Sequence, residues 1–213
     1  MKETYHDEIE QGQRSAIADT RDYPMIFDTR MVKAILYGEK TETRRLFTKS
    51  LLKKIESAQK IWLDGNYWIA QLENGKPVGF KCPYGEPGDL IWVKETLLAS
   101  NTISYKANFP QYVLIRNKKN LSWKASIHMK KTDARLWLYI KEISVQRIQS
   151  ITEEEARQEG AGTGKVLNFN GVKEKTFREG FYEKWISTYG IESWHENPWV
   201  WAIKFIKHPL NNL

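Results

Sequence analysis

A long run of alternating apolar and polar residues, 134–149 (ARLWLYIKEISVQRIQ), most constrains the fold of this chain. Side chains of a β-strand point to opposite faces in turn, so this alternation, with its Leu, Ile, Trp and Tyr content, predicts a strand. The run is much longer than a typical strand of about five to six residues. We therefore expect a bent strand running along a small barrel. A second alternating run, 198–208 (PWVWAIKFIKH), predicts the strand that closes the fold.

Shorter patterns predict the other elements. Strands are expected at 25–27 and 90–96, and a hairpin at 67–83 with its turn at 73–76. Helices are expected at 31–36, 49–60, 152–160 and 176–190, the third with a capping box of Thr152 and Glu155. Many strands and few short helices predict an α+β fold, a small β-barrel flanked by short helices, rather than a doubly wound sheet.

The pattern divides the chain into a polar tail and one domain. Residues 1–22 are polar and of mixed charge, so we expect a loose tail, followed by a single domain at 23–208. Insertions into that domain are expected at about 48–80 and 160–175. The second insertion is rich in glycine and is expected to be a flexible loop. Its GAGTGK segment does not have the G-x-x-x-x-G-K-[ST] spacing of a phosphate-binding loop.

Composition excludes several classes of protein. No apolar run approaches the ~18–20 residues of a membrane span, and the first residues lack the apolar core of a signal peptide. We therefore expect a cytoplasmic protein with no membrane partner. Cys82 is the single cysteine, which rules out an internal disulfide framework, and we expect its thiol to be structural. The four histidines are scattered, so no metal and no cofactor is expected. We further expect a monomer.

Positive charge is concentrated in the middle of the chain. The formal net charge is +7, and residues 81–150 contain twelve Lys or Arg against five Asp or Glu, an excess equal to the whole of it. Aromatic residues are interleaved with these cations: Trp92, Tyr105, Tyr112, Trp123 and Trp137. This combination favours a polyanion whose bases can stack, so RNA or DNA is an expected partner. A solvated cationic face explains the charge alone equally well.

The segment 38–45 (GEKTETRR) follows the first expected helix, which Gly38 should stop, and it contains no apolar side chain. An ordinary surface turn explains this composition, with Lys40 solvated and Thr43 at the start of a strand. A site that needs an amine, a hydroxyl and guanidinium groups together explains it as well. The spacing alone does not decide between the two interpretations.

The order of these landmarks resembles that of ASCH-domain proteins, a branch of the PUA-like β-barrel superfamily associated with RNA. The resemblance is carried by G-x-K-x-x-T-x-R at 38–45, a PGD turn and strand at 87–96, the acidic helix at 151–160 and the aromatic strand at 197–205. Segments 24–36, 122–140 and 197–205 are similar to the long version common in phages and prophages, which implies the host cytoplasm for a phage-encoded chain. The resemblance covers roughly residues 24–206.

The resemblance implies a cleft beside the barrel that binds RNA, DNA or a modified nucleoside. Small bacterial members are amidohydrolases that deacylate N4-acetylcytidine with a Lys and a Thr from the motif and a Glu from the acidic helix. By position these are Lys40, Thr43 and Glu159, with Glu155 as the alternative acid. This chain is longer than those enzymes, and its basic insertions either build a polynucleotide site or cover the pocket.

This residue set suits amide hydrolysis, which needs a nucleophile, proton transfer and a stabilised oxyanion. A desolvated lysine can act as base for a threonine hydroxyl, because burial lowers the pKa of an amine toward neutrality. A glutamate can carry the proton to the leaving amine or hold water. The chain must bend between Lys40 and Thr43, because residues three apart point to opposite faces of a strand. Glu159 is otherwise an ordinary solvated helix acid.

A second group of candidates precedes the long strand. By resemblance to the phage version, Ser126 and His128 are expected in the cleft wall, with Trp123, Lys124 and Lys130 as further substrate or nucleic-acid contacts. His128 could read a base edge or a phosphate. A lone histidine at the entry to a strand is more simply a hydrogen-bonded structural residue.

The arginine pair of the motif is expected to split between two faces. Arg44 and Arg45 alternate in an extended chain, so at most one faces the cleft. We expect this to be Arg45, the arginine of the motif, as a phosphate or base-stacking contact.

The leading hypothesis is a barrel that binds a nucleoside or a nucleic-acid segment and hydrolyses an N-acylated base. The alternative is a non-catalytic RNA- or DNA-binding module, in which the same Lys and Arg side chains contact phosphates. A third hypothesis is a protein-interaction domain that uses its aromatic surface. Release of acetate from N4-acetylcytidine separates the first hypothesis from the other two.

Overall fold

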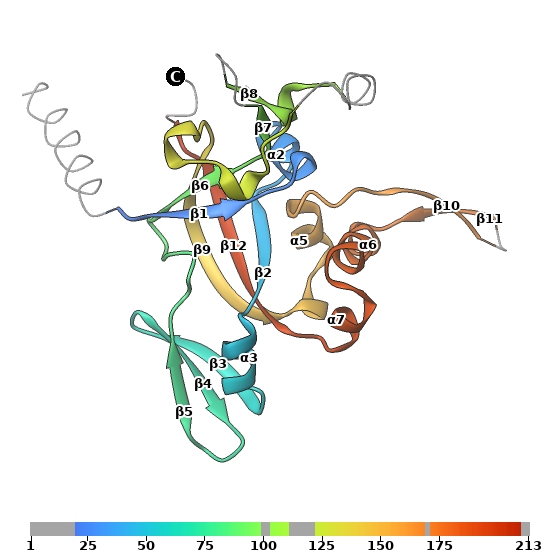
Figure 1. The fold of residues 1–213 in the computed structure, drawn as a ribbon. Coiled ribbons are helices and arrows are strands. Elements are labelled where there is room, and N and C mark those ends of the chain that lie inside the picture. The colour runs from blue at the N-terminus through green and yellow to red at the C-terminus, as the bar shows by residue number, and fades with distance from the viewer. Residues whose placement is uncertain (1–19, 99–102, 111–121, 169–170, 210–213) are drawn as a thin grey trace, which may run out of the picture.

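The computed structural model describes residues 20–98, 103–110, 122–168 and 171–209. It is an α+β protein whose centre is a five-stranded sheet of order β1-β6-β9-β12-β2 (Figure 1). The strands are β1 (Asp22–Ile26), β6 (Leu90–Lys94), β9 (Trp137–Arg147), β12 (Trp199–Lys207) and β2 (Glu42–Leu46). β1 and β6 are parallel, and the other neighbours are antiparallel. The long strands predicted near 134–149 and 198–208 are confirmed, and they pair with each other.

The sheet curls until its two edge strands approach each other (Figure 1). The register of β9 and β12 shifts between Lys204 and Phe205, and such a bulge bends an antiparallel pair. At the edges, Arg45 Nη2 on β2 donates a 2.9 Å hydrogen bond to the carbonyl of Ile26 on β1. Backbone pairing among the described strands does not join β1 to β2, so the sheet is curved and open, with a side chain across the gap.

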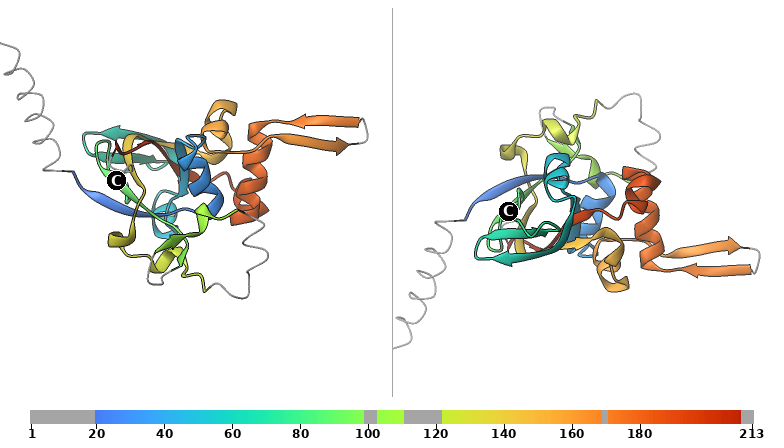
Figure 2. Two further views of the ribbon diagram at one scale, coloured as in Figure 1. Left: turned by 90° about the horizontal axis from the view of Figure 1, so that it is seen from above. Right: turned by 90° about the horizontal axis from the view of Figure 1, so that it is seen from below.

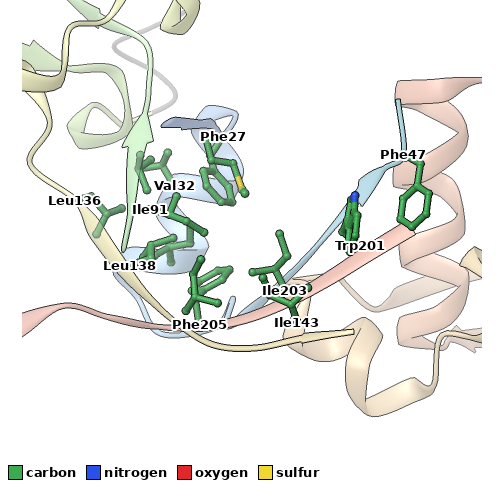
Figure 3. Packing of buried hydrophobic residues seen from close by; sticks show 14 of the residues in the cluster. Phe27, Val32, Phe47, Ile91, Leu136, Leu138, Ile143, Trp201, Ile203 and Phe205 are labelled. Atoms are coloured by element: carbon green, nitrogen blue, oxygen red, sulfur yellow. The ribbon is translucent and has the colours of Figure 1, made fainter. Parts of the chain in front are cut away.

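The main hydrophobic core lies against this sheet (Figure 3). Trp201 and Ile203, two apart on β12, both point into it, as the period of a strand requires. Helix α2 (Thr29–Leu36) covers the core with Val32 and Ile35, which are fully buried. Burial of each such side chain contributes about 1.5–3 kcal/mol relative to exposure. This core holds β2, and therefore the segment 38–45, in place.

A second, smaller core lies on the opposite face of β12, beneath three helices: α5 (Glu153–Gln158), α6 (Phe177–Tyr189) and α7 (Ile191–His195) (Figure 1). Val200, one residue before Trp201, packs here against Phe181 and Trp185 of α6. The capping box predicted for α5 is confirmed, and α6 has a capping box of its own. The short helix α7 was not predicted.

The first insertion is only partly as predicted. Helix α3 (Lys49–Lys54) ends well before residue 60, because Ile55 turns into the core and is fully buried. The chain then forms a three-stranded sheet of β3 (Ala58–Asp64), β4 (Tyr67–Leu72) and β5 (Pro77–Phe80). The predicted hairpin at 67–83 corresponds to β4 and β5, and the strand β3 was missed.

The second insertion contradicts its prediction as a flexible loop. β10 (Gly164–Asn168) and β11 (Gly171–Lys175) pair as an antiparallel hairpin that projects from the body of the protein (Figure 2). The two strands are held together by backbone hydrogen bonds. Such bonds can form without the alternation of apolar and polar side chains that predicts a half-buried strand. The glycine-rich composition therefore concealed it.

The remaining described segments are short. They are β7 (Leu97–Leu98), β8 (Ser104–Tyr105) and the 3₁₀ helices η1 (Lys106–Asn108), η2 (Ser126–His128), η3 (Lys131–Asp133) and η4 (Ile148–Ser150). Most of the predicted tail, residues 1–19, lies outside the described residues. None of the described helices is long and apolar enough to cross a membrane.

Candidate functional site

Lys40 and Glu159, 119 residues apart in the sequence, meet as a buried ion pair. The side chain of Lys40 is fully buried, and its Nζ lies 2.5 Å from Glu159 Oε2. The same ammonium donates to two backbone carbonyls, that of Glu159 at 2.9 Å and that of Glu42 at 2.7 Å. All three N–H groups of Lys40 therefore have acceptors, as a buried ammonium requires.

Two helix ends bring this pair together. Gly38 ends α2 with a φ of 78°, as predicted, and the Lys40 amide then donates to the Ala34 carbonyl at 3.1 Å. Glu159 is the C-cap of α5 and forms an antiparallel bridge with Lys40. Gly160 follows with a φ of 69°, and a Cβ there would lie 3.3 Å from the Cβ atoms of Ala34 and Lys40. Glycine is favoured there by its backbone conformation and by this close approach.

Burial and charge both act on the pKa values of the pair. Burial lowers the pKa of Lys40 to about 8, against the opposing attraction of the Glu159 carboxylate. Burial alone would raise the pKa of Glu159, but the charges of Lys40 and Arg44 outweigh it and hold that pKa below its ordinary value. At neutral pH both groups are ionised, and the neutral amine of Lys40 becomes the major form only above about pH 8.

A second charged cluster lies between β2 and α5, centred on Arg44. Its Nη2 lies 3.1 Å from Glu42 Oε1 and 3.3 Å from Glu155 Oε2, and its Nη1 lies 3.5 Å from Glu159 Oε1. Gln146 also belongs to the cluster. When its amide oxygen faces Arg44, that oxygen accepts a hydrogen bond from Arg44 Nε at 3.1 Å. Glu155, the alternative acid in the sequence, thus contacts Arg44 and closes the capping box of α5. Glu159 is the acid that contacts Lys40.

Glu42 is the least satisfied member of the Arg44 cluster. It is fully buried, and no described residue donates a hydrogen bond to either carboxylate oxygen. The approach of Arg44 is an ion-pair contact without hydrogen-bond alignment. Burial therefore raises the pKa of Glu42 to about 7, with Arg44 opposing the shift.

The stability of the protein is expected to fall as the pH rises from about 5 to about 7.5. Glu42 holds its proton up to about pH 7 when folded but releases it near 4.5 when unfolded, so the folded state binds more protons in this window. Glu42→Gln cannot ionise and should remove this fall. The midpoints of urea unfolding at about pH 5 and about pH 7.5 measure this fall in stability. Glu56→Gln, at an exposed position, is the matched control. The same fall in Glu42→Gln would contradict the assignment.

Thr43 lies on the opposite face of β2 from Glu42. It pairs with Ile203 of β12, so both side chains lie on the face of the sheet that carries the main core. Its hydroxyl is buried and has no hydrogen-bond partner among the described residues, Lys40 included. Lys40 itself precedes the strand and reaches the outer edge of β2 at the Glu42 carbonyl. A buried polar group without a partner is unusual, and a role in binding or catalysis is one explanation for it.

Arg45 bridges the two edges of the curled sheet. Its Nη1 donates to the Arg44 carbonyl at 3.2 Å and its Nη2 to the Ile26 carbonyl at 2.9 Å, and its guanidinium lies 4.9 Å from the Phe27 ring centre. Arg44 and Arg45 point to opposite faces, yet both belong to the wall of one small cavity beside Glu159. The expectation that at most one of them faces a cleft is therefore wrong, because the cavity lies at an edge strand, where both faces can be reached.

Two adjoining cavities lie between α2 and α6. The larger has a volume of about 540 Å³ and extends from the start of α2, across the loop that follows α5, to α6. The smaller, of about 40 Å³, is lined by Glu159, Arg44 and Arg45 together with residues of α6. Both cavities have Met31, Lys184 and Thr188 in their walls. The side chains at the site therefore adjoin a volume in the usual range for small-molecule sites.

Helix α6 shapes the larger cavity through one close contact. Gly180 packs against the backbone of Gly162, where a Cβ on residue 180 would lie 2.0 Å from the Gly162 oxygen. One turn further along the helix, Lys184 belongs to the walls of both cavities. Lys184 was not predicted as a site residue. The available signal was its position three residues after the buried Phe181, on the inward face of the helix.

The second group of predicted contacts lies in a separate segment before β9: Trp123, Lys124, Ser126, His128 and Lys130. The tryptophan packs edge-on against Phe109 with 5.4 Å between ring centres, and the following lysine forms a β-bridge with Leu97. The histidine and the last lysine are exposed. None of the five is among the described residues that line the two cavities, so the structure does not bring this group to the Lys40–Glu159 pair.

No family model, no curated protein and no solved structure matches this chain. Among the residues that the structure describes, no three His, Cys, Asp or Glu side chains are grouped so that they could hold a metal ion. The described side chains at the site supply an amine, carboxylates, guanidinium groups and a hydroxyl.

Proposed function

We propose that this chain is an ASCH domain of the PUA-like kind, which binds a nucleoside or nucleic-acid segment between α2 and α6 and hydrolyses an N-acylated base such as N4-acetylcytidine. The observation that carries the proposal is the buried Lys40–Glu159 pair, in contact at 2.5 Å beside two cavities. The resemblance in motif order assigns catalytic roles to these two residues, and a buried lysine with a lowered pKa is what a neutral-pH base requires.

In the proposed reaction, Thr43 is the nucleophile. Lys40 first passes a proton to Glu159, which is already hydrogen-bonded to it. The amine and the Thr43 hydroxyl are not in contact in the structure, so they must come together before the neutral amine accepts the hydroxyl proton. The hydroxyl oxygen forms a bond to the acyl carbon, and the bond from that carbon to the exocyclic nitrogen breaks. Glu159 returns its proton to the leaving amine. Water then attacks the acyl-threonine ester, which releases the carboxylic acid and restores the hydroxyl.

The proposal requires the cleft to open. The side chains of Lys40 and Thr43 are fully buried, and neither belongs to the wall of either cavity. The smaller cavity, of about 40 Å³, has room for only a few water molecules. A bound base must therefore separate α6 from β2 to reach Lys40 and Glu159, and the Thr43 side chain must leave the main-core face to meet it. Closure of such a site over its substrate would exclude water during the reaction.

The direct test is turnover. Purified protein incubated with N4-acetylcytidine is expected to release cytidine and acetate in equal amounts, with a rate that falls as the pH rises above about 8, because the Lys40–Glu159 pair then loses the proton that the leaving amine needs. Chromatography follows cytidine, and a coupled assay follows acetate. Absence of both products with acetyl, propionyl and longer acyl cytidines, tested as nucleosides and as 5′-monophosphates, would rule out the proposed activity. Lys53→Ala, at an exposed position on α3, is the control for charge removal.

A non-catalytic RNA- or DNA-binding module is the second candidate, and one observation favours it. Each N–H group of Lys40 already has an acceptor, so the lysine is a satisfied ammonium that can support the fold without reacting. In that case the protein binds single-stranded nucleic acid, binding weakens as salt displaces the phosphate contacts, and no acetate appears.

A further inference from the structure

The wall of the larger cavity carries two cationic side chains that have no partner among the residues that the structure describes. Its charged lining residues are Asp28, Arg30, Lys175, Glu183 and Lys184. Lys175 pairs with Glu183, with 2.7 Å between Nζ and Oε2, and Asp28 accepts the 2.7 Å hydrogen bond that caps α2. Within the described parts of the chain, the side chains of Arg30 and Lys184 make no hydrogen bond and no ion pair. The cavity wall therefore carries cationic N–H groups that are available to bind an anion.

Lys184 is the more informative of these two cations, because it is half-buried and stands between the two cavities. Burial lowers the pKa of this lysine, and the carboxylates of Glu159 and Asp28 oppose the shift without contacting it directly. An ammonium that has lost part of its water without gaining an acceptor is costly, and an anionic ligand would offset that cost. Arg30, exposed at the rim, can reach the same ligand with a planar pair of donors.

We propose that Lys184 and Arg30 bind a phosphate group of the substrate, so that the substrate is a nucleotide or a nucleic-acid strand and not a free nucleoside. This inference rests on the proposed function, since a nucleoside derivative carries its negative charge as phosphate. Lys184 belongs to the walls of both cavities, so the phosphate lies where they join and the base extends toward Glu159. The carboxylates of Asp28 and Glu183 lie in the same wall and disfavour an anion placed away from the two cations.

Binding calorimetry on the full chain tests this without requiring turnover. Cytidine 5′-monophosphate is expected to bind at least about tenfold more tightly than cytidine, as one charge-assisted hydrogen bond allows. Lys184→Met should remove this advantage and leave the affinity for cytidine unchanged, while Lys184→Arg should keep part of it. Lys53→Met, which removes an exposed lysine from α3, should change neither affinity. The thermal midpoint of Lys184→Met confirms that the variant is folded.

A second ligand identifies the source of the phosphate. Cytidylyl-cytidine has only an internal diester, so an advantage shared by it and the monophosphate indicates a strand, and an advantage confined to the monophosphate indicates a free nucleotide. Equal affinity for cytidine and both phosphate ligands, or no binding of any of them, would overturn the inference. Tighter binding of the phosphate ligands without release of acetate would support the phosphate site and contradict the hydrolase activity. Release of acetate without tighter binding of the phosphate ligands would support the hydrolase activity and contradict the phosphate site.

Discussion

Replacing Lys40 by methionine is expected to lower the free energy of unfolding by about 3–5 kcal/mol, the cost of removing one partner from a buried ion pair. The change leaves the Glu159 carboxylate buried next to an apolar side chain, and it leaves the carbonyls of Glu42 and Glu159 without their donor. Urea denaturation at neutral pH measures the difference. The variant is also expected to be inactive, because it lacks the amine.

Two further variants separate the ion pair from its surroundings. Lys204→Met removes a half-buried lysine whose Nζ lies 3.0 Å from Glu142 Oε2, and it should cost less than about 1 kcal/mol. Adding Glu159→Gln to Lys40→Met should recover part of the lost stability, because no Glu159 carboxylate is then left buried without the Lys40 ammonium. If Lys40→Met costs no more than Lys204→Met, the Lys40–Glu159 pair does not stabilise the fold.

Thr43→Val is expected to lower the rate of deacylation by about 100-fold or more, as loss of the nucleophile requires. The same substitution should change the free energy of unfolding by less than about 1 kcal/mol, because valine has the shape of threonine and the lost hydroxyl has no partner among the described residues. Loss of activity without loss of stability therefore distinguishes a reacting hydroxyl from a structural one. Initial rates with N4-acetylcytidine and urea midpoints provide the two measurements.

Thr43→Ser is the matched control for the nucleophile, since it keeps the hydroxyl and loses a methyl group. It should retain part of the activity but lose some stability, because the buried methyl leaves a small cavity beside the main core. Full activity in Thr43→Val would show that this hydroxyl does not attack the acyl carbon. A large loss of stability in Thr43→Val would show that the hydroxyl has a structural partner.

Local patterns predicted the elements whose side chains alternate or whose ends are capped. The strands β9 and β12 followed from alternation, because each buries one face against the core. The helix α5 followed from Thr152 and Glu155, because a capping box is made entirely by residues near in sequence. The hairpin of β10 and β11 could not be found in this way, since its ladder consists of backbone pairs within a glycine-rich segment.

The candidate site shows where sequence reasoning reaches its limit. The motif order singled out Lys40 and Glu159, and the tertiary structure brings them into contact. Spacing could not assign Glu159 over Glu155, because several acids lie on one short helix and only the packing of α5 against β2 gives each its partner. Lys184 escaped notice for a related reason: a lysine on a helix is ordinary until packing places it in a cavity wall.

The sequence by itself determined that this chain is an α+β protein with two long strands, a capped helix at 152–160 and a polar segment at 38–45 without apolar side chains. These features depend on residues a few positions apart, where the geometry of strand and helix decides the outcome. The tertiary structure alone decided that Lys40 is buried with three acceptors, that Thr43 points into the core face and that Arg45 spans the sheet edges. Those results depend on the curl of the sheet and the approach of α5, and such long-range contacts have no signature within any short stretch of chain.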